Sequence, residues 1–126
     1  MTHSHSASYL RSHRKRSGLS QKEVASLLGY KHEGEISRHE RLLSAPPFHV
    51  ALAYEALYRV PIAQIFPGVY ESRKEEVEAR LTKLVEVLHQ CNASGREAAM
   101  IARKLEWVWE RVNQENASLF DENGRA

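Results

Sequence analysis

The sequence contains a single cysteine, Cys91, which excludes an internal disulfide framework and any metal site built from several thiolates. No run of apolar residues reaches the roughly 20 that a helix needs to cross a bilayer. The first ten residues, MTHSHSASYL, lack the charged and then hydrophobic stretches of a secretory signal. From these absences we expect a cytoplasmic protein that works in a reducing compartment without a membrane partner.

Motifs of catalysis are also missing from the sequence. It contains no glycine-rich loop for a phosphate, no Ser/His/Asp order with a supporting motif and no cluster of metal ligands. Glu35 and His39 are four residues apart, as two metal ligands on one helix would be, but without a third ligand nearby we interpret them as a surface pair. We therefore expect no enzyme activity, no cofactor and no metal.

The net charge of +2 conceals an uneven distribution. Residues 1–70 carry nine Lys or Arg and five Glu, a net charge of +4. Residues 71–126 carry nine Lys or Arg and eleven Asp or Glu, a net charge of −2. A basic first part and a slightly acidic second part indicate an anionic partner for the first part alone.

Apolar residues recur at helical spacing, and no alternating pattern is sustained, so the sequence predicts an all-α protein. Gly18 and Gly29 each stand where a helix would end, and Ser20 with Glu23 forms a capping-box pattern between them. In the first part the expected helices span residues 9–17, 20–28, 33–41, 48–58 and about 61–66.

The second part, beyond Pro67-Gly68, has the pattern of two amphipathic helices joined by a short turn. The first would span about 72–90, and the second would continue to about 115 with a heptad-like apolar seam. Such a pair favours an antiparallel hairpin. The predicted organisation is a flexible tail over residues 1–8, a first domain over 9–68, the hairpin over 71–115 and a frayed tail over 116–126.

The order of short helices around Gly29 is that of a helix-turn-helix. Three segments carry a family resemblance: residues 19–25 (LSQKEVA), 36–41 (ISRHER) and 60–66 (VPIAQIF). They resemble the Cro/C1-type (XRE family) helix-turn-helix transcriptional regulators over residues 10–66. The resemblance implies a five-helix, lambda-repressor-like domain that binds double-stranded DNA with the second helix of the pair in the major groove.

Two sets of candidate DNA contacts follow from this placement. Gln21, at the start of the second helix, can donate its amide to a phosphate beside the free N–H groups of the helix end, a contact that the resemblance also implies. The candidate phosphate contacts are Arg11, Gln21, Lys22 and Arg41. The candidate base-reading residues are Lys31, His32, Glu33, Glu35 and Arg38, of which Arg38 can form a bidentate pair with guanine.

The resemblance further implies a structural ion pair between Arg14 and Glu40, which would orient the reading helix. The start of that helix departs from the family, because Glu33 and Glu35 repel phosphates and one extra residue separates Gly29 from Ile36. This departure leaves open whether the chain reads DNA or has become a protein-interaction module.

The apolar edge of the hairpin needs a covering surface, which is either the first domain or the hairpin of a second chain. Because helix-turn-helix proteins bind two half-sites as dimers, we expect a homodimer on a (pseudo)palindromic operator. The expected dimerisation residues are Leu81, Leu84, Leu88, Ile101, Leu105 and Val108. The alternative is a protein-interaction module, or an antitoxin-like repressor, whose C-terminal hairpin binds a partner protein.

Overall fold

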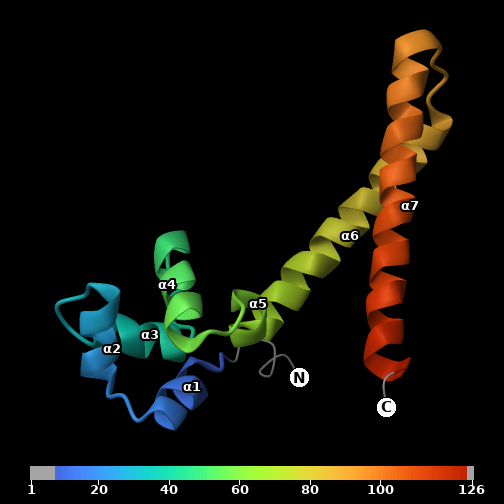
Figure 1. Cartoon of the computed structure of the whole chain (residues 1–126). Helices are drawn as coiled ribbons and strands as arrows, with labels where there is room; N and C mark the ends of the chain where they lie inside the picture. Colours follow the sequence, from blue (N-terminus) through green and yellow to red (C-terminus); the bar gives the residue numbers. More distant parts are fainter. Residues whose placement is uncertain (1–7, 125–126) are drawn as a thin grey trace. The chain divides into compact units, whose positions relative to one another are not determined.

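The structure is a computed structural model that describes residues 8–124, and over these residues the chain is entirely helical apart from its turns (Figure 1). The all-α prediction is confirmed. No helix in this part of the chain is long and apolar enough to span a bilayer. The helices are α1 (Leu10–Ser17), α2 (Gln21–Leu28), α3 (Gly34–Glu40), α4 (Phe48–Tyr58), α5 (Ile62–Ile65), α6 (Pro67–Gln90) and α7 (Gly95–Gly124).

The predicted N-terminal tail lies outside the described residues except for its last member, Ser8. That residue donates a hydrogen bond from its hydroxyl to the backbone carbonyl of Glu40, at 2.8 Å. Ser8 is therefore part of the folded domain, and the predicted tail is too long by one residue.

The chain divides between Glu76 and Val77, within α6, into two compact units. Pro67 and Gly68, predicted to separate two domains, are instead the first two residues of α6, which begins earlier than the expected residue 72. A proline is tolerated in the first turn of a helix because the N–H that it lacks would have no intrahelical partner there. The Pro-Gly pair therefore starts a helix and does not mark the boundary between the two units.

Local sequence signals set the ends of α1 and α2. Gly18 and Gly29 follow these helices with φ angles of 78° and 89°, in the left-handed region that glycine adopts without steric cost. The predicted capping box is present: the backbone N–H of Glu23 donates to Ser20 Oγ at 3.0 Å, and that of Ser20 donates to Glu23 Oε1 at 2.9 Å. These caps place α2 and the turn that leads to α3.

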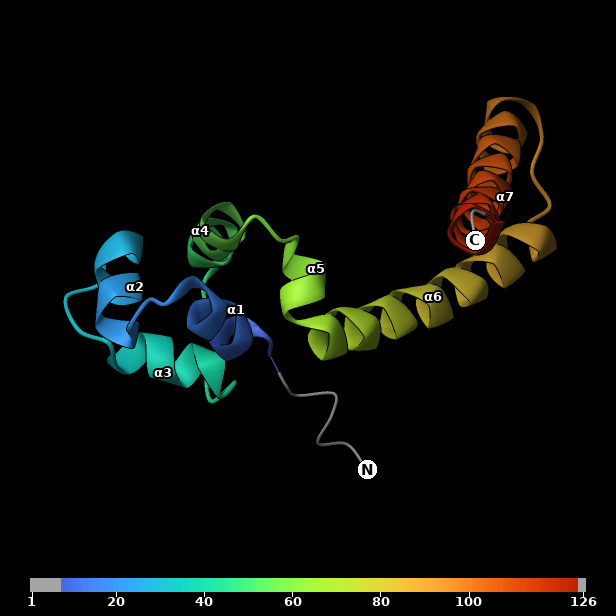
Figure 2. The same ribbon diagram turned by 60° about the horizontal axis from the view of Figure 1, so that its bottom comes forward.

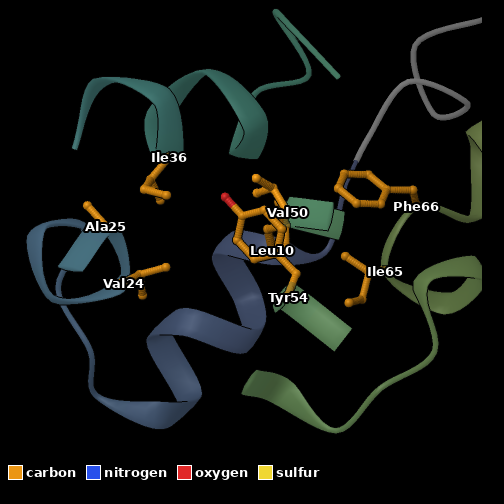
Figure 3. Packing of buried hydrophobic residues seen from close by; sticks show 8 residues of the cluster. All are labelled: Leu10, Val24, Ala25, Ile36, Val50, Tyr54, Ile65 and Phe66. Atoms are coloured by element: carbon orange, nitrogen blue, oxygen red, sulfur yellow. The ribbon is translucent and has the colours of Figure 1, made fainter. Parts of the chain in front are cut away.

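Eight buried side chains form the core of the first unit (Figure 3). They converge from the five short helices and from the residue after α5, and are Leu10, Val24, Ala25, Ile36, Val50, Tyr54, Ile65 and Phe66. Burying a large apolar side chain stabilises a fold by roughly 1.5–3 kcal/mol. Ile36 is fully buried, so it attaches α3 to this core and leaves the opposite side of α3 in solvent.

In the second unit, α7 returns alongside the later part of α6 (Figures 1 and 2). Leu88 is buried, and the residues that face the seam are half-buried, namely Leu81, Val85, Ala98, Ile101, Leu105 and Val108. A charged hydrogen bond from the Arg111 guanidinium to Glu78 Oε1 joins the two helices. The two long helices are thus in contact, as the fold prediction required.

The expected end of the second long helix at residue 115 is wrong, because α7 continues to Gly124. The segment from Asn113 to Asn123 is mostly polar, but it contains neither glycine nor proline. Polarity alone does not end a helix, since many polar residues are good helix formers. The helix therefore reaches Gly124, within the segment that was predicted to fray.

Candidate nucleic-acid interface

The two sides of α3 differ sharply in exposure. Ile36, His39 and Glu40 are buried, whereas Glu35 and Arg38 are exposed, as are Glu33 and Gly34 at the start of the helix. The buried side packs against the core, with Ile36 pointing into it from α3 (Figure 3). The exposed side is free to meet a ligand, as the second helix of a helix-turn-helix requires.

A buried carboxylate holds three helices together. Glu40 accepts from Arg14 twice, through Nε at 2.6 Å and Nη2 at 3.1 Å, so the ion pair expected from the resemblance is present. Glu40 Oε1 also accepts from Gln21 Nε2 at 3.0 Å. The hydrogen bond with Glu40 raises the pKa of the Arg14 guanidinium above its ordinary value. This Arg14–Glu40–Gln21 network fixes α3 against α1 and α2.

An open groove lies at the start of α2, and all four candidate phosphate contacts line it: Arg11, Gln21, Lys22 and Arg41. The side chains of Arg11, Lys22 and Arg41 are exposed, whereas Gln21 is half-buried and held by Glu40. Ser20, Ser37 and Glu33 also line the groove. Three cations beside the N-terminus of a helix form an arrangement that can bind a phosphate.

The five candidate base-reading residues all lie on the exposed surface before and along α3, and they are Lys31, His32, Glu33, Glu35 and Arg38. Lys31 and His32 stand in the turn between α2 and α3, and Glu33 is the residue that precedes α3. Glu33 also lines the groove of the candidate phosphate contacts, so the two candidate sets adjoin at the start of α3.

The comparison with known families agrees with this geometry. A family model described as helix-turn-helix matches residues 10–65. Residues 10–65 are a Cro/C1-type helix-turn-helix domain. Such domains bind DNA, and their family consists of regulators and not of enzymes. No curated protein and no solved structure matches the chain.

His39, which was predicted to lie on the surface, is a structural residue of the helix-turn-helix domain. Its Nε2 lies 3.8 Å from Glu35 Oε2, so the predicted pair with Glu35 is present, but His39 is 1% exposed and its predicted position on the surface is wrong. Its Nδ1 lies 2.9 Å from the hydroxyl of Tyr54, and its ring meets the Tyr54 and Tyr30 rings edge to face. The available signal was its position three residues after Ile36, which places both on one side of a helix.

The contact between His39 and Tyr54 extends into a row of aromatic rings across the helix-turn-helix domain. Tyr54 stacks on Tyr58, with ring centroids 6.3 Å apart, and Tyr58 stacks on His13 of α1 at 5.7 Å. Burial raises the pKa of Tyr58 to about 12, so its phenol stays neutral at physiological pH. The row connects α3, α4 and α1 beneath the reading surface.

We expect the helix-turn-helix domain to lose stability as the pH falls below about 6.5. Burial lowers the pKa of His39, with Arg38 adding to this effect and Glu35 opposing it, and burial together with Arg16 lowers the pKa of His13. Histidines with a lowered folded pKa take up protons more readily in the unfolded chain. Stability is then full above the unfolded pKa and decreases as the pH falls through it.

Urea unfolding at several pH values between 7.5 and 5 measures this dependence. The variant His39→Gln should lose part of the pH slope, and the part that remains should belong to His13. Equal slopes for the variant and the original chain would show that His39 does not contribute.

Proposed function

We propose that the chain is a sequence-specific, double-stranded DNA-binding transcriptional regulator that acts as a homodimer on a (pseudo)palindromic operator. The observation that carries the proposal is the helix-turn-helix domain with its exposed α3 and, beside it, a groove lined by Arg11, Lys22 and Arg41. Those cations contact backbone phosphates, and α3 enters the major groove.

The base-reading role falls first on Arg38 and the two glutamates. Arg38 projects from the exposed side of α3 and can donate two hydrogen bonds to a guanine. Glu33 and Glu35 are exposed at the start of α3, and each can accept a hydrogen bond from the amino group of a cytosine. A site rich in G·C pairs at these positions suits this set of side chains.

Replacing Arg38 with alanine should weaken binding to the preferred site by about 10- to 100-fold, because a bidentate contact to guanine is worth roughly 1–3 kcal/mol. Binding to unrelated DNA should change much less. Fluorescence anisotropy on a site selected from a random pool measures both affinities. The control Arg96→Ala removes the same charge from the first turn of α7, outside the helix-turn-helix domain.

The sequence of the selected site tests the proposal as a whole. Two half-sites in inverted repeat, with a centre-to-centre separation of about one helical turn, are expected for a homodimer. Equal loss of affinity in the Arg38 and Arg96 variants, or the absence of salt-sensitive and sequence-preferring binding, would contradict the proposal.

An interaction module is the second candidate, and the exposed glutamates Glu33 and Glu35 favour it because they repel a phosphate backbone. Replacing both glutamates with glutamine distinguishes a DNA-binding regulator from a protein-interaction module. A DNA reader loses or alters its sequence preference, whereas a protein-interaction module without DNA binding gains non-specific affinity for DNA as its acidic charge is removed.

A further inference from the structure

The second unit buries little apolar surface by itself. Among the side chains of residues 77–118 only Leu88 is buried, although seven large apolar side chains are exposed: Val77, Leu84, Val87, Met100, Trp107, Trp109 and Val112. Two helices with so small a core are not expected to be stable in water without a further partner. A contiguous part of this exposed surface should therefore be covered in the working protein.

The residues of the seam are already covered within the chain. Leu81, Ile101, Leu105 and Val108 are half-buried between α6 and α7, and Leu88 is buried. Of the six residues expected to form the dimer contact, only Leu84 remains exposed, with 46% of its surface accessible. The surface that is left for a partner therefore lies beside the seam and not along it.

A shallow depression marks that surface on α7. It is lined by Met100, Arg103, Lys104, Glu106, Trp107 and Glu110. Met100 and Trp107 are seven residues apart, so they lie on the same side of the helix two turns from each other. One face of the Trp107 ring is covered by the Arg111 guanidinium, 5.3 Å from the ring centroid.

The charges of the unit limit what can fill this depression. Its rim carries two cations and two glutamates, and residues 77–118 carry six Lys or Arg and six Glu. A surface without net charge does not attract a phosphate backbone or an acidic segment. Two identical neutral hairpins, in contrast, approach each other without repulsion.

We propose that the depression between Met100 and Trp107 receives Leu84 and Val87 from α6 of a second copy, so that two hairpins form a four-helix bundle. Leu84 and Val87 lie three residues apart on one side of α6 and are both exposed, Val87 by 62%. In a two-fold arrangement each copy supplies both the depression and the side chains that enter it, so the contact forms twice. The inference rests on the proposed function, since it places the contact of the proposed homodimer.

The test uses the full chain and measures the dimer dissociation constant by sedimentation. Trp107→Glu should raise that constant by about 100-fold, as expected for a central aromatic residue. The new carboxylate lies one turn from Arg111, and a circular dichroism spectrum reports whether the helices persist. The matched control is Trp109→Glu, because Trp109 is 64% exposed but points about 200° around the helix from Trp107.

The reciprocal variant makes the pairing itself testable. Val87→Lys should also dissociate the dimer, and an equimolar mixture with the Trp107→Glu chain should restore dimers. In the mixed dimer one contact joins the two new opposite charges, and the other retains the original tryptophan and valine. Failure of the mixture to associate, or a stronger effect of the Trp109 variant, would overturn the proposed contact.

DNA binding separates this inference from the proposed function. If the Trp107 variant remains dimeric while the original chain binds an inverted repeat, the contact is wrong and the regulator stands. If the original chain is a dimer that Trp107→Glu dissociates, but the original chain binds no DNA, the contact is confirmed and the proposed regulator is wrong.

Discussion

Replacing Glu40 with alanine should lower the free energy of unfolding of the helix-turn-helix domain by about 3 to 5 kcal/mol. The Glu40 carboxylate, with 3% of its side chain exposed, is the shared acceptor for Arg14 and Gln21. Its removal leaves the guanidinium of Arg14, whose side chain is 12% exposed, without a counter-ion in a poorly hydrated position. The loss of stability comes more from the unpaired, poorly hydrated charge of Arg14 than from the lost attraction between Arg14 and Glu40.

Thermal unfolding followed by circular dichroism measures the effect, and a loss of this size should lower the midpoint by more than about 10 °C for a domain of this length. Arg14→Ala should lower stability and DNA affinity together. In the double variant Arg14→Met with Glu40→Met much of the stability should return, because no buried charge remains. Glu35→Ala is the control on the same helix, since the Glu35 side chain is 50% exposed. A small effect of Glu40→Ala would show that the network does not hold α3.

Replacing Tyr54 with alanine should cost about 3 to 5 kcal/mol of stability, the usual range for deletion of a buried aromatic ring. Tyr54 lies fully buried in α4 among the core side chains (Figure 3), and its hydroxyl lies 2.9 Å from Nδ1 of His39. The variant Tyr54→Phe keeps the ring and removes only the hydroxyl, so it should cost about 1 kcal/mol. The difference between the two variants separates packing from the hydrogen bond.

Urea unfolding of the two Tyr54 variants gives both values, and Tyr9→Ala serves as the control because Tyr9 is 51% exposed. The phenylalanine variant should also shift the pH at which stability declines, since His39 loses the group beside its Nδ1. Equal costs for the alanine and phenylalanine variants would mean that the ring itself contributes little to the core.

The first five helices could be predicted from the sequence because their ends carry strong local signals. Gly18, Gly29 and the Ser20–Glu23 capping box determine backbone geometry over a few residues, and the structure has the helix ends at or next to the predicted residues. The start of α6 and the end of α7 could not be placed as well. Proline and polar residues are compatible with either a helix or a loop, and the surrounding structure decides between them.

The interior of the site was harder to predict than its surface. Charged residues such as Lys22 and Arg38 are exposed to solvent, as their charge predicts. The order of the helices along the chain also predicts that Lys22 lies on α2 and Arg38 on α3. His39 and Gln21 are polar residues whose partners are distant in the sequence, namely Tyr54 and Glu40. Only the packing of α3 against α1, α2 and α4 brings those groups together, so a reading of local patterns does not reveal them.

The hydrogen bond between Gln21 and Glu40 has a consequence for the entropy of DNA binding. A long, polar side chain that is free in solution loses rotamer freedom when it meets a phosphate, at roughly 0.5–1.5 kcal/mol for each chain that is immobilised. Gln21 has already lost that freedom in the folded domain, because one amide N–H is held at 3.0 Å by Glu40. Its other N–H can donate to a phosphate from a side chain that is already in place. At this position the loss of rotamer entropy therefore occurs when the domain folds and not when it binds DNA.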